Sequence, residues 1–160
     1  MKISKIISGG QTGADYGGLK AAKAKQVLTG GVCPAGWKTE KGSNPNLADF
    51  GLVCTKSPSY QYRTRINIAK SDATIIFYRP PLDAGSKLTK KICIELKKPV
   101  FLVSTNNIEK YYDDLQLHCK AWLNAIDGNI LNVAGNRESK NPGIEKFVER
   151  FLIDILDEQI

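Results

Sequence analysis

Short apolar runs alternate with longer stretches of helical periodicity along this chain. The apolar runs predict strands at residues 3–7, 28–32, 51–54, 74–78, 100–102 or 103, and 129–133, the first of them β-branched. The helical stretches cover residues 14–25, 60–70, 86–97, 108–125 and 142–156. Strands that alternate with helices are joined by crossovers and lie parallel. We therefore expect an α/β fold, a three-layer sandwich with a mostly parallel central sheet flanked by helices, formed by residues 1–160 as one domain.

Two further local signals concern the element boundaries. Asn141 followed by Pro142 has the pattern of a helix N-cap with proline at the first helical position. The segment 33–58 is rich in Gly and Pro, and we expect a long functional loop there, interrupted by the short strand at 51–54.

The charge of the chain narrows the range of partners. The 160 residues include 23 Lys and Arg against 16 Asp and Glu, which gives a net charge of +7. The lysines are spread along the predicted helices rather than gathered on one face with aromatic residues, so no nucleic-acid surface is indicated. A positive excess of this size attracts a small polyanion at long range.

The sequence also bears on compartment and metal binding. No apolar run approaches the ~18 residues of a membrane span, and Met1-Lys2 leads directly into a strand. We therefore expect a cytoplasmic protein without membrane contact. Four scattered cysteines and one histidine do not indicate a metal site, and buried apolar roles are favoured for the cysteines. Cys33 is the exception, because its segment is expected to face the binding site.

The segment between the first strand and the first helix carries the clearest functional signal. It reads Ser8-Gly9-Gly10-Gln11-Thr12-Gly13-Ala14-Asp15. A glycine turn between strand and helix presents backbone N–H groups to an anion, and glycine lets phosphate oxygens approach the backbone. Ser8 and Thr12 can add hydroxyl donors. The segment is either a tight structural turn or, as we favour, a site for an anionic, phosphorylated small molecule. Asp15 either interacts with the helix dipole or contacts a donor-rich group of the ligand.

Other polar segments are expected to join this turn. Ligands bind at the carboxyl ends of parallel strands, so the loops 8–15, 30–40, 79–89 and 134–141 should converge on one crevice. In the third loop Gly85 allows close approach, while Ser86 either only caps the helix or also donates to a phosphate.

The predicted helix at 60–70 adds an arginine. Arg63 and Asn67 are four residues apart and share a face, either as a surface pair or as a contact for phosphate or carboxylate. Asp72 precedes the next strand and can pair with Arg63 to orient it.

Several motifs follow one another along the chain in the order seen in a known protein family. They are Ser8–Asp15, Gly30-Gly31-x-Cys33-Pro34-x-Gly36, Tyr62-Arg63-Thr64-x-x-Asn67, Ser71-Asp72-Ala73-Thr74, and Leu131 to Ser139 followed by Pro142-Gly143-Ile144. Together they resemble the family of molybdenum carrier proteins over nearly the whole chain. The resemblance implies a Rossmann-like fold related to the lysine-decarboxylase-like proteins, a homo-oligomer (dimer or tetramer), and the binding of molybdenum cofactor (molybdopterin), a pterin with a phosphate and a dithiolene-held metal.

The sequence departs from the family pattern at two places. Ala84-Gly85-Ser86 stands where relatives usually have Gly-Gly-Thr, and Asn136 stands where members often have Pro. Related phosphoribohydrolases carry a glutamate three residues after that threonine, where this chain has Thr89. Hydrolysis of an N-glycosidic bond needs a carboxylate for the attacking water. The change argues against hydrolysis, unless Asp15 or Asp72 substitutes.

The first hypothesis is therefore a non-catalytic carrier, with no catalytic and no metal-ligating residue predicted. Its glycine turns cradle phosphate, Arg63 and Arg137 offset negative charge, and Cys33 touches the metal end. The expected ligand-binding residues are Ser8, Gly9, Gly10, Gln11, Thr12, Gly13, Asp15, Cys33, Arg63, Asn67, Gly85, Ser86, Thr89 and Arg137. The alternatives are a nucleoside-monophosphate phosphoribohydrolase and a nucleotide-binding sensor of the lysine-decarboxylase-like group.

Overall fold

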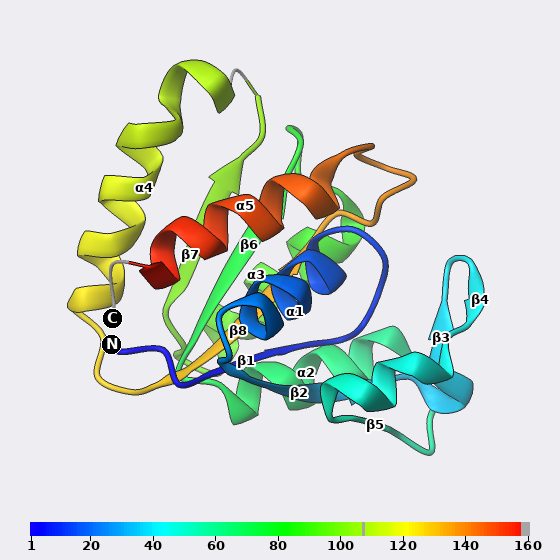
Figure 1. Ribbon diagram of the computed structural model, residues 1–160. Coiled ribbons are helices and arrows are strands. Elements are labelled where there is room, and N and C mark those ends of the chain that lie inside the picture. The colour runs from blue at the N-terminus through cyan, green and yellow to red at the C-terminus, as the bar shows by residue number, and fades with distance from the viewer. Residues whose placement is uncertain (107, 158–160) are drawn as a thin grey trace.

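A six-stranded parallel sheet forms the centre of the computed structural model, which describes residues 1–106 and 108–157 (Figure 1). The expected domain 1–160 thus includes residues 107 and 158–160, which lie outside the described part. The strand order is β5-β2-β1-β8-β6-β7, and each neighbouring pair is parallel. The strands are β1 (Lys5–Ser8), β2 (Leu28–Cys33), β5 (Leu52–Cys54), β6 (Ala73–Tyr78), β7 (Val100–Ser104) and β8 (Ile130–Gly135).

Helices cover both faces of this sheet, which confirms the expected α/β sandwich with three layers. The helices are α1 (Ala14–Ala24), α2 (Tyr60–Lys70), α3 (Ala84–Glu95), α4 (Ile108–Asn124) and α5 (Ile144–Asp157). Helices α1, α4 and α5 pack on one face, and α2 and α3 pack on the other (Figure 1). None of the helices in the described residues is long and apolar enough to cross a membrane.

The main core lies between the sheet and the layer of α1, α4 and α5. Strand β6 supplies a continuous buried run, as expected for a strand covered on both faces. Its Phe77 meets Phe151 of α5 edge to face, with ring centroids 5.5 Å apart. A smaller cluster of Ile68, Ile92 and Cys93 joins α2 and α3 on the opposite face.

Helix α1 lies unusually close to its neighbours because two glycines face them. A Cβ atom on Gly17 would lie 2.4 Å from the carbonyl oxygen of Glu145 in α5, and one on Gly18 would lie 2.8 Å from Cβ of Val133 in β8. The missing side chains therefore let α1 sit directly on β8 and α5. This contact fixes the start of α1, and with it the turn that follows β1.

Two expectations about boundaries are wrong. The segment 33–58 is not one long loop, because it contains two 3-10 helices (Ala35–Trp37 and Pro45–Phe50) and a hairpin of β3 (Lys38–Thr39) and β4 (Gly42–Ser43). Helix α5 begins at Ile144 rather than at Pro142, since Gly143 has φ 89° and interrupts the helical backbone.

We expect Gly17→Ala to lower the free energy of unfolding by about 1–3 kcal/mol, because the new methyl group overpacks α1 against α5. Urea unfolding followed by circular dichroism measures the change. Gly85→Ala is the matched control, since a Cβ there would meet only Asp83 Oδ1 at 3.7 Å and the helical position favours alanine. Equal stability of Gly17→Ala and the wild type would contradict the close-packing account.

Candidate functional site

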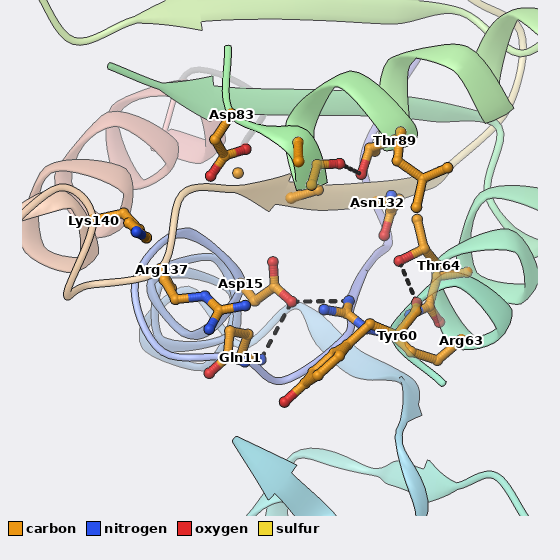
Figure 2. Close-up of a pocket in the computed structure, with 16 residues that line it drawn as sticks. Gln11, Asp15, Tyr60, Arg63, Thr64, Asp83, Thr89, Asn132, Arg137 and Lys140 are labelled. Carbon is orange, nitrogen blue, oxygen red and sulfur yellow. Dashed lines mark hydrogen bonds and ion pairs between the residues drawn. The ribbon is translucent and has the colours of Figure 1, made fainter. Parts of the chain in front are cut away.

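A cavity of about 390 Å³ opens at the carboxyl ends of the strands (Figure 2). It lies at the switch point of the sheet around β8, where the chain runs from β1 to β2 toward one edge and from β6 to β7 toward the other. Four segments form its walls: the turn after β1, the first turns of α2, the start of α3, and β8 with the loop that follows it. The lining residues are Gln11, Asp15, Tyr60, Arg63, Thr64, Asn67, Asp83, Ala84, Gly85, Leu88, Thr89, Asn132, Ala134, Gly135, Arg137 and Lys140.

An ion pair between α1 and α2 lies on one side of the cavity. Arg63 Nη1 is 3.1 Å from Asp15 Oδ2, and the two side chains are 12% and 4% exposed (Figure 2). The backbone N–H groups of Gln11 and Gly9 also donate to the Asp15 carboxylate, the former at 3.2 Å. The carboxylate of Asp15 thus accepts the hydrogen bonds that the sequence analysis assigns to a phosphate.

The glycines of the turn serve this ion pair. A Cβ atom on Gly9 would lie 1.4 Å from Arg63 Nη1, so the guanidinium group occupies the space over the glycine. Ser8 Oγ accepts from Gly10 N at 3.2 Å, and Ser8 is fully buried. Side chains of the protein, Arg63 and Ser8, therefore fill this turn. The sequence pattern predicts instead a turn whose backbone N–H groups are open to a phosphate.

Burial raises the pKa of Asp15 above its ordinary value. The positive charge of Arg63 and the donated hydrogen bonds act in the opposite direction without cancelling the effect of burial. Asp15 is therefore a carboxyl group whose charge depends on Arg63.

The start of α3 is capped by Asp83, not by Ser86 as one reading of the sequence has it. Asp83 Oδ1 accepts from Ser86 N at 2.7 Å, and Asp83 Oδ2 accepts from Asn136 Nδ2 at 2.8 Å. Ser86 is in the third position of the helix and is 2% exposed. Its hydroxyl does not line the cavity, and it has no hydrogen-bond partner among the described residues.

A third acidic side chain caps α5. Glu138 Oε1 accepts from Gly143 N at 2.5 Å, and Glu138 Oε2 accepts from Glu145 N at 3.1 Å. The helix starts of α1, α3 and α5 at this edge of the sheet are each accompanied by a carboxylate from the chain itself. Each of these carboxylates lowers the attraction of its helix end for an external anion.

Glu40, at the tip of the β3–β4 hairpin, ties three segments together. Its carboxylate accepts hydrogen bonds from the hydroxyl groups of Thr12 and Ser139, and from Ser139 N at 3.2 Å. Burial acts to raise the pKa of Glu40, but the hydrogen bonds from Ser139 and Thr12 outweigh it and lower the pKa. Glu40 N donates in turn to Gln11 Oε1 at 2.9 Å.

Positive charge and an aromatic ring meet at the cavity. Tyr60 is the first residue of α2, and the guanidinium carbons of Arg63 and Arg137 lie 5.8 and 6.0 Å from the centroid of its ring. Lys140 also lines the cavity and is exposed. Figure 2 shows Gln11, Arg137 and Lys140 on one side of the cavity and Thr64 and Arg63 on the other.

Half of the predicted ligand-binding residues line the cavity. They are Gln11, Asp15, Arg63, Asn67, Gly85, Thr89 and Arg137. The rest lie outside its lining: Ser8, Gly9, Gly10, Thr12, Gly13, Cys33 and Ser86. The loop 30–40 contributes no lining residue, and helix α2 takes the place expected for it.

Two of the predicted residues have structural contacts instead. Asn67 is 1% exposed, and its amide accepts from Val32 N at 2.8 Å and donates to Val32 O at 3.0 Å, which holds α2 to β2. Cys33 is fully buried beside Cys54, with the two sulfur atoms 3.2 Å apart. Burial raises the pKa of Cys33 to about 12, so its thiol stays protonated at neutral pH.

The expected pair of Asp72 and Arg63 does not form. Asp72 lies at the opposite edge of the sheet, where Oδ2 accepts from Asn129 N at 2.8 Å and from Ile130 N at 2.9 Å. Asp72 holds the start of β8, and it cannot supply a carboxylate to the cavity.

The predicted ligand-binding residues leave out five residues of the cavity that carry polar groups or a ring: Tyr60, Thr64, Asp83, Asn132 and Lys140. Asp83 and Lys140 belong to loops that the sequence analysis assigns to the crevice, so their positions could have identified them as residues of the site. Asn132 is a polar residue inside an apolar strand and is 3% exposed, which is a second usable signal.

We expect Arg63→Met to lower the free energy of unfolding by about 3 kcal/mol at pH 7, because the buried Asp15 carboxylate loses its counter-charge. Without Arg63 the pKa of Asp15 rises further in the folded state. Folding then takes up a proton, so the stability of the variant is greatest at acid pH and falls as pH rises through that pKa. Urea unfolding between pH 4 and pH 8 measures this. A deficit independent of pH would show that Asp15 does not depend on Arg63.

Glu40→Gln should lower the free energy of unfolding by about 1 kcal/mol at pH 7, because it weakens charge-assisted hydrogen bonds. Since the pKa of Glu40 is lowered in the fold from its ordinary value of 4.5, its contribution is complete above that value and is lost as the pH falls below it. Thermal melts at pH 7 and pH 3.5 should therefore show a difference that shrinks at acid pH. Glu109→Gln, at a side chain 82% exposed, is the control and should change neither melt.

Comparisons with known proteins identify the family of the chain and agree with its fold. Residues 6–156 match the circularly permutated YpsA SLOG family. A crystal structure described as a putative molybdenum carrier protein from Syntrophus aciditrophicus SB is 32% identical in sequence, with a TM-score of 0.89, over 97% of this chain and 95% of that one. No curated protein sequence matches the chain. The resemblance to molybdenum carrier proteins is confirmed, and the chain belongs to the circularly permutated YpsA SLOG family.

Proposed function

We propose that this protein is a carrier that binds molybdenum cofactor, a phosphorylated pterin, in the cavity at the carboxyl ends of the strands. The observation that carries the proposal is the meeting of three cationic side chains and one aromatic ring, from Arg63, Arg137, Lys140 and Tyr60, around one cavity. The similarity to a protein described as a molybdenum carrier supports the choice of cargo.

The chemistry of the cavity suits such a ligand. Its volume of about 390 Å³ lies in the usual range for small-molecule sites. The ring of Tyr60 offers a surface for a flat heterocycle, and the amide of Asn132 on the central strand β8 offers hydrogen bonds to a ring edge. In this proposal the dithiolene sulfur atoms of the cofactor hold the metal, and the protein contacts the pterin and its phosphate.

The residues of the cavity suit the binding of a ligand better than its hydrolysis. Thr89 stands at the position of the glutamate of the related hydrolases, and its hydroxyl donates to Gly85 O at 3.0 Å. The two carboxyl groups that line the cavity both have structural partners, Arg63 for Asp15 and the start of α3 for Asp83. A water molecule activated for attack needs a carboxylate that is free to take its proton.

Binding of the cofactor is tested by anaerobic titration of the purified protein with molybdenum cofactor, followed by gel filtration and assay of molybdenum and pterin. We expect saturable binding at one site per chain and a higher melting temperature with the ligand. Double substitution of Arg63 and Arg137 by Gln should weaken binding. Lack of saturable binding by a folded protein would refute the proposal.

The hydrolase alternative has its own readout. The wild-type protein should release no free base from nucleoside monophosphates, measured by chromatography after prolonged incubation. Base release that disappears in Asp15→Asn, but persists in Asp72→Asn, would replace the carrier by an enzyme that uses Asp15.

A further inference from the structure

We propose that the phosphate of the ligand binds to the side chains of Gln11, Arg137 and Lys140, and not to the glycine turn or to a helix start. The inference rests on the proposed function for the identity of the ligand as a phosphorylated pterin. It assigns which end of the cavity takes the anion, and therefore which way round the pterin lies.

The first step is that the backbone sites for an anion are already filled. Asp15 accepts from the turn after β1, Asp83 from the start of α3, and Glu138 from the start of α5. A phosphate at any of these places would displace or oppose a carboxylate. Side chains therefore have to supply the positive charge for the ligand.

The second step is a buried donor without a partner. Gln11 is 6% exposed and lines the cavity. Its Oε1 accepts from Thr12 N at 3.0 Å and from Glu40 N at 2.9 Å, which fixes the orientation of the amide. Its Nε2 is buried and has no hydrogen-bond partner among the described residues. A buried amide donor of this kind calls for an acceptor atom, which a phosphate oxygen supplies.

The third step is the placement of two cations beside that donor. Lys140 N donates to Arg137 O at 3.0 Å, so a turn after β8 brings the two residues to the same part of the cavity. Arg137 Nε lies 3.9 Å from Glu40 Oε2, which orients the guanidinium group. Figure 2 shows Arg137 beside Gln11, with Lys140 pointing toward the same space. The planar guanidinium group of Arg137 and the ammonium group of Lys140 together suit a phosphate dianion.

The placement orients the rest of the ligand. With phosphate at this corner, the pterin ring extends across the cavity toward Asn132, Thr64 and Thr89 on the opposite side. The same ligand turned end for end would put its phosphate near Thr64, Thr89 and Asn132, where the nearby cation, Arg63, is already paired with Asp15.

The test uses the full-length protein and two probes, the oxidised phosphopterin released from molybdenum cofactor and the same pterin after phosphatase treatment. Arg137→Gln with Lys140→Gln should weaken binding of the phosphopterin by about tenfold or more, and leave binding of the dephosphorylated pterin unchanged. Gln11→Glu, which keeps the acceptor oxygen but replaces the donor, should also select against the phosphopterin. Lys2→Gln with Lys70→Gln removes the same charge from the opposite edge of the sheet, and should have no selective effect.

Equal loss for both pterins, or no loss in the Arg137 and Lys140 variant, would overturn the assignment. A second probe separates this result from failure of the carrier proposal. Inorganic pyrophosphate, followed by ³¹P NMR line broadening, reports on the anion site without a pterin. Broadening by the wild type that is lost in the double variant supports the subsite even if no pterin binds, and pyrophosphate binding that survives in the double variant refutes it.

Discussion

The ion pair of Asp15 and Arg63 is the contact on which the architecture of the site depends. It joins the start of α1 to the first turn of α2, two helices on opposite faces of the sheet, across the carboxyl end of β1. It also closes the turn after β1, because the guanidinium group lies over Gly9 and the carboxylate accepts from the backbone. Neither charge could stay buried alone, so the two helices and the turn hold their positions together.

Closing the turn changes how the protein can recognise an anion. In the usual arrangement, fixed backbone N–H groups and a helix dipole bind phosphate. Here acidic side chains of the chain occupy those donors, and the charge available to a ligand comes from arginine and lysine side chains at the rim. Such a site binds through flexible cations that are in contact with water. Its affinity is then sensitive to salt, and its occupant can leave without disturbing the core. Those properties would suit the proposed role as a carrier.

The sequence predicted the layers well because they follow from local periodicity. The continuous apolar run of β6 and the bounds of α2 (Tyr60–Lys70) are both visible in the chain alone. The partners of polar residues were predicted poorly. Asp72 was expected beside Arg63, but it lies at the other edge of the sheet because it precedes β6 instead of following it. Ser86 was a candidate cap, but Asp83, three residues earlier, caps α3, a choice between two capping residues that local sequence leaves open.

The β3–β4 hairpin shows why the lining of a cavity is only part of a site. Neither strand of the hairpin lines the cavity, yet Glu40 at its tip bonds Thr12 and Ser139 and supplies one of the two backbone donors that orient the Gln11 amide. The two hydrogen bonds to Oε1 fix which way the Gln11 amide is turned, and with it the position of the buried Nε2. A residue 29 positions away in the sequence therefore helps to set which atom of Gln11 the proposed ligand would meet. Because this link runs through one hairpin tip, a shift of that tip would alter the proposed anion subsite while leaving the sheet and the ion pair of Asp15 and Arg63 in place.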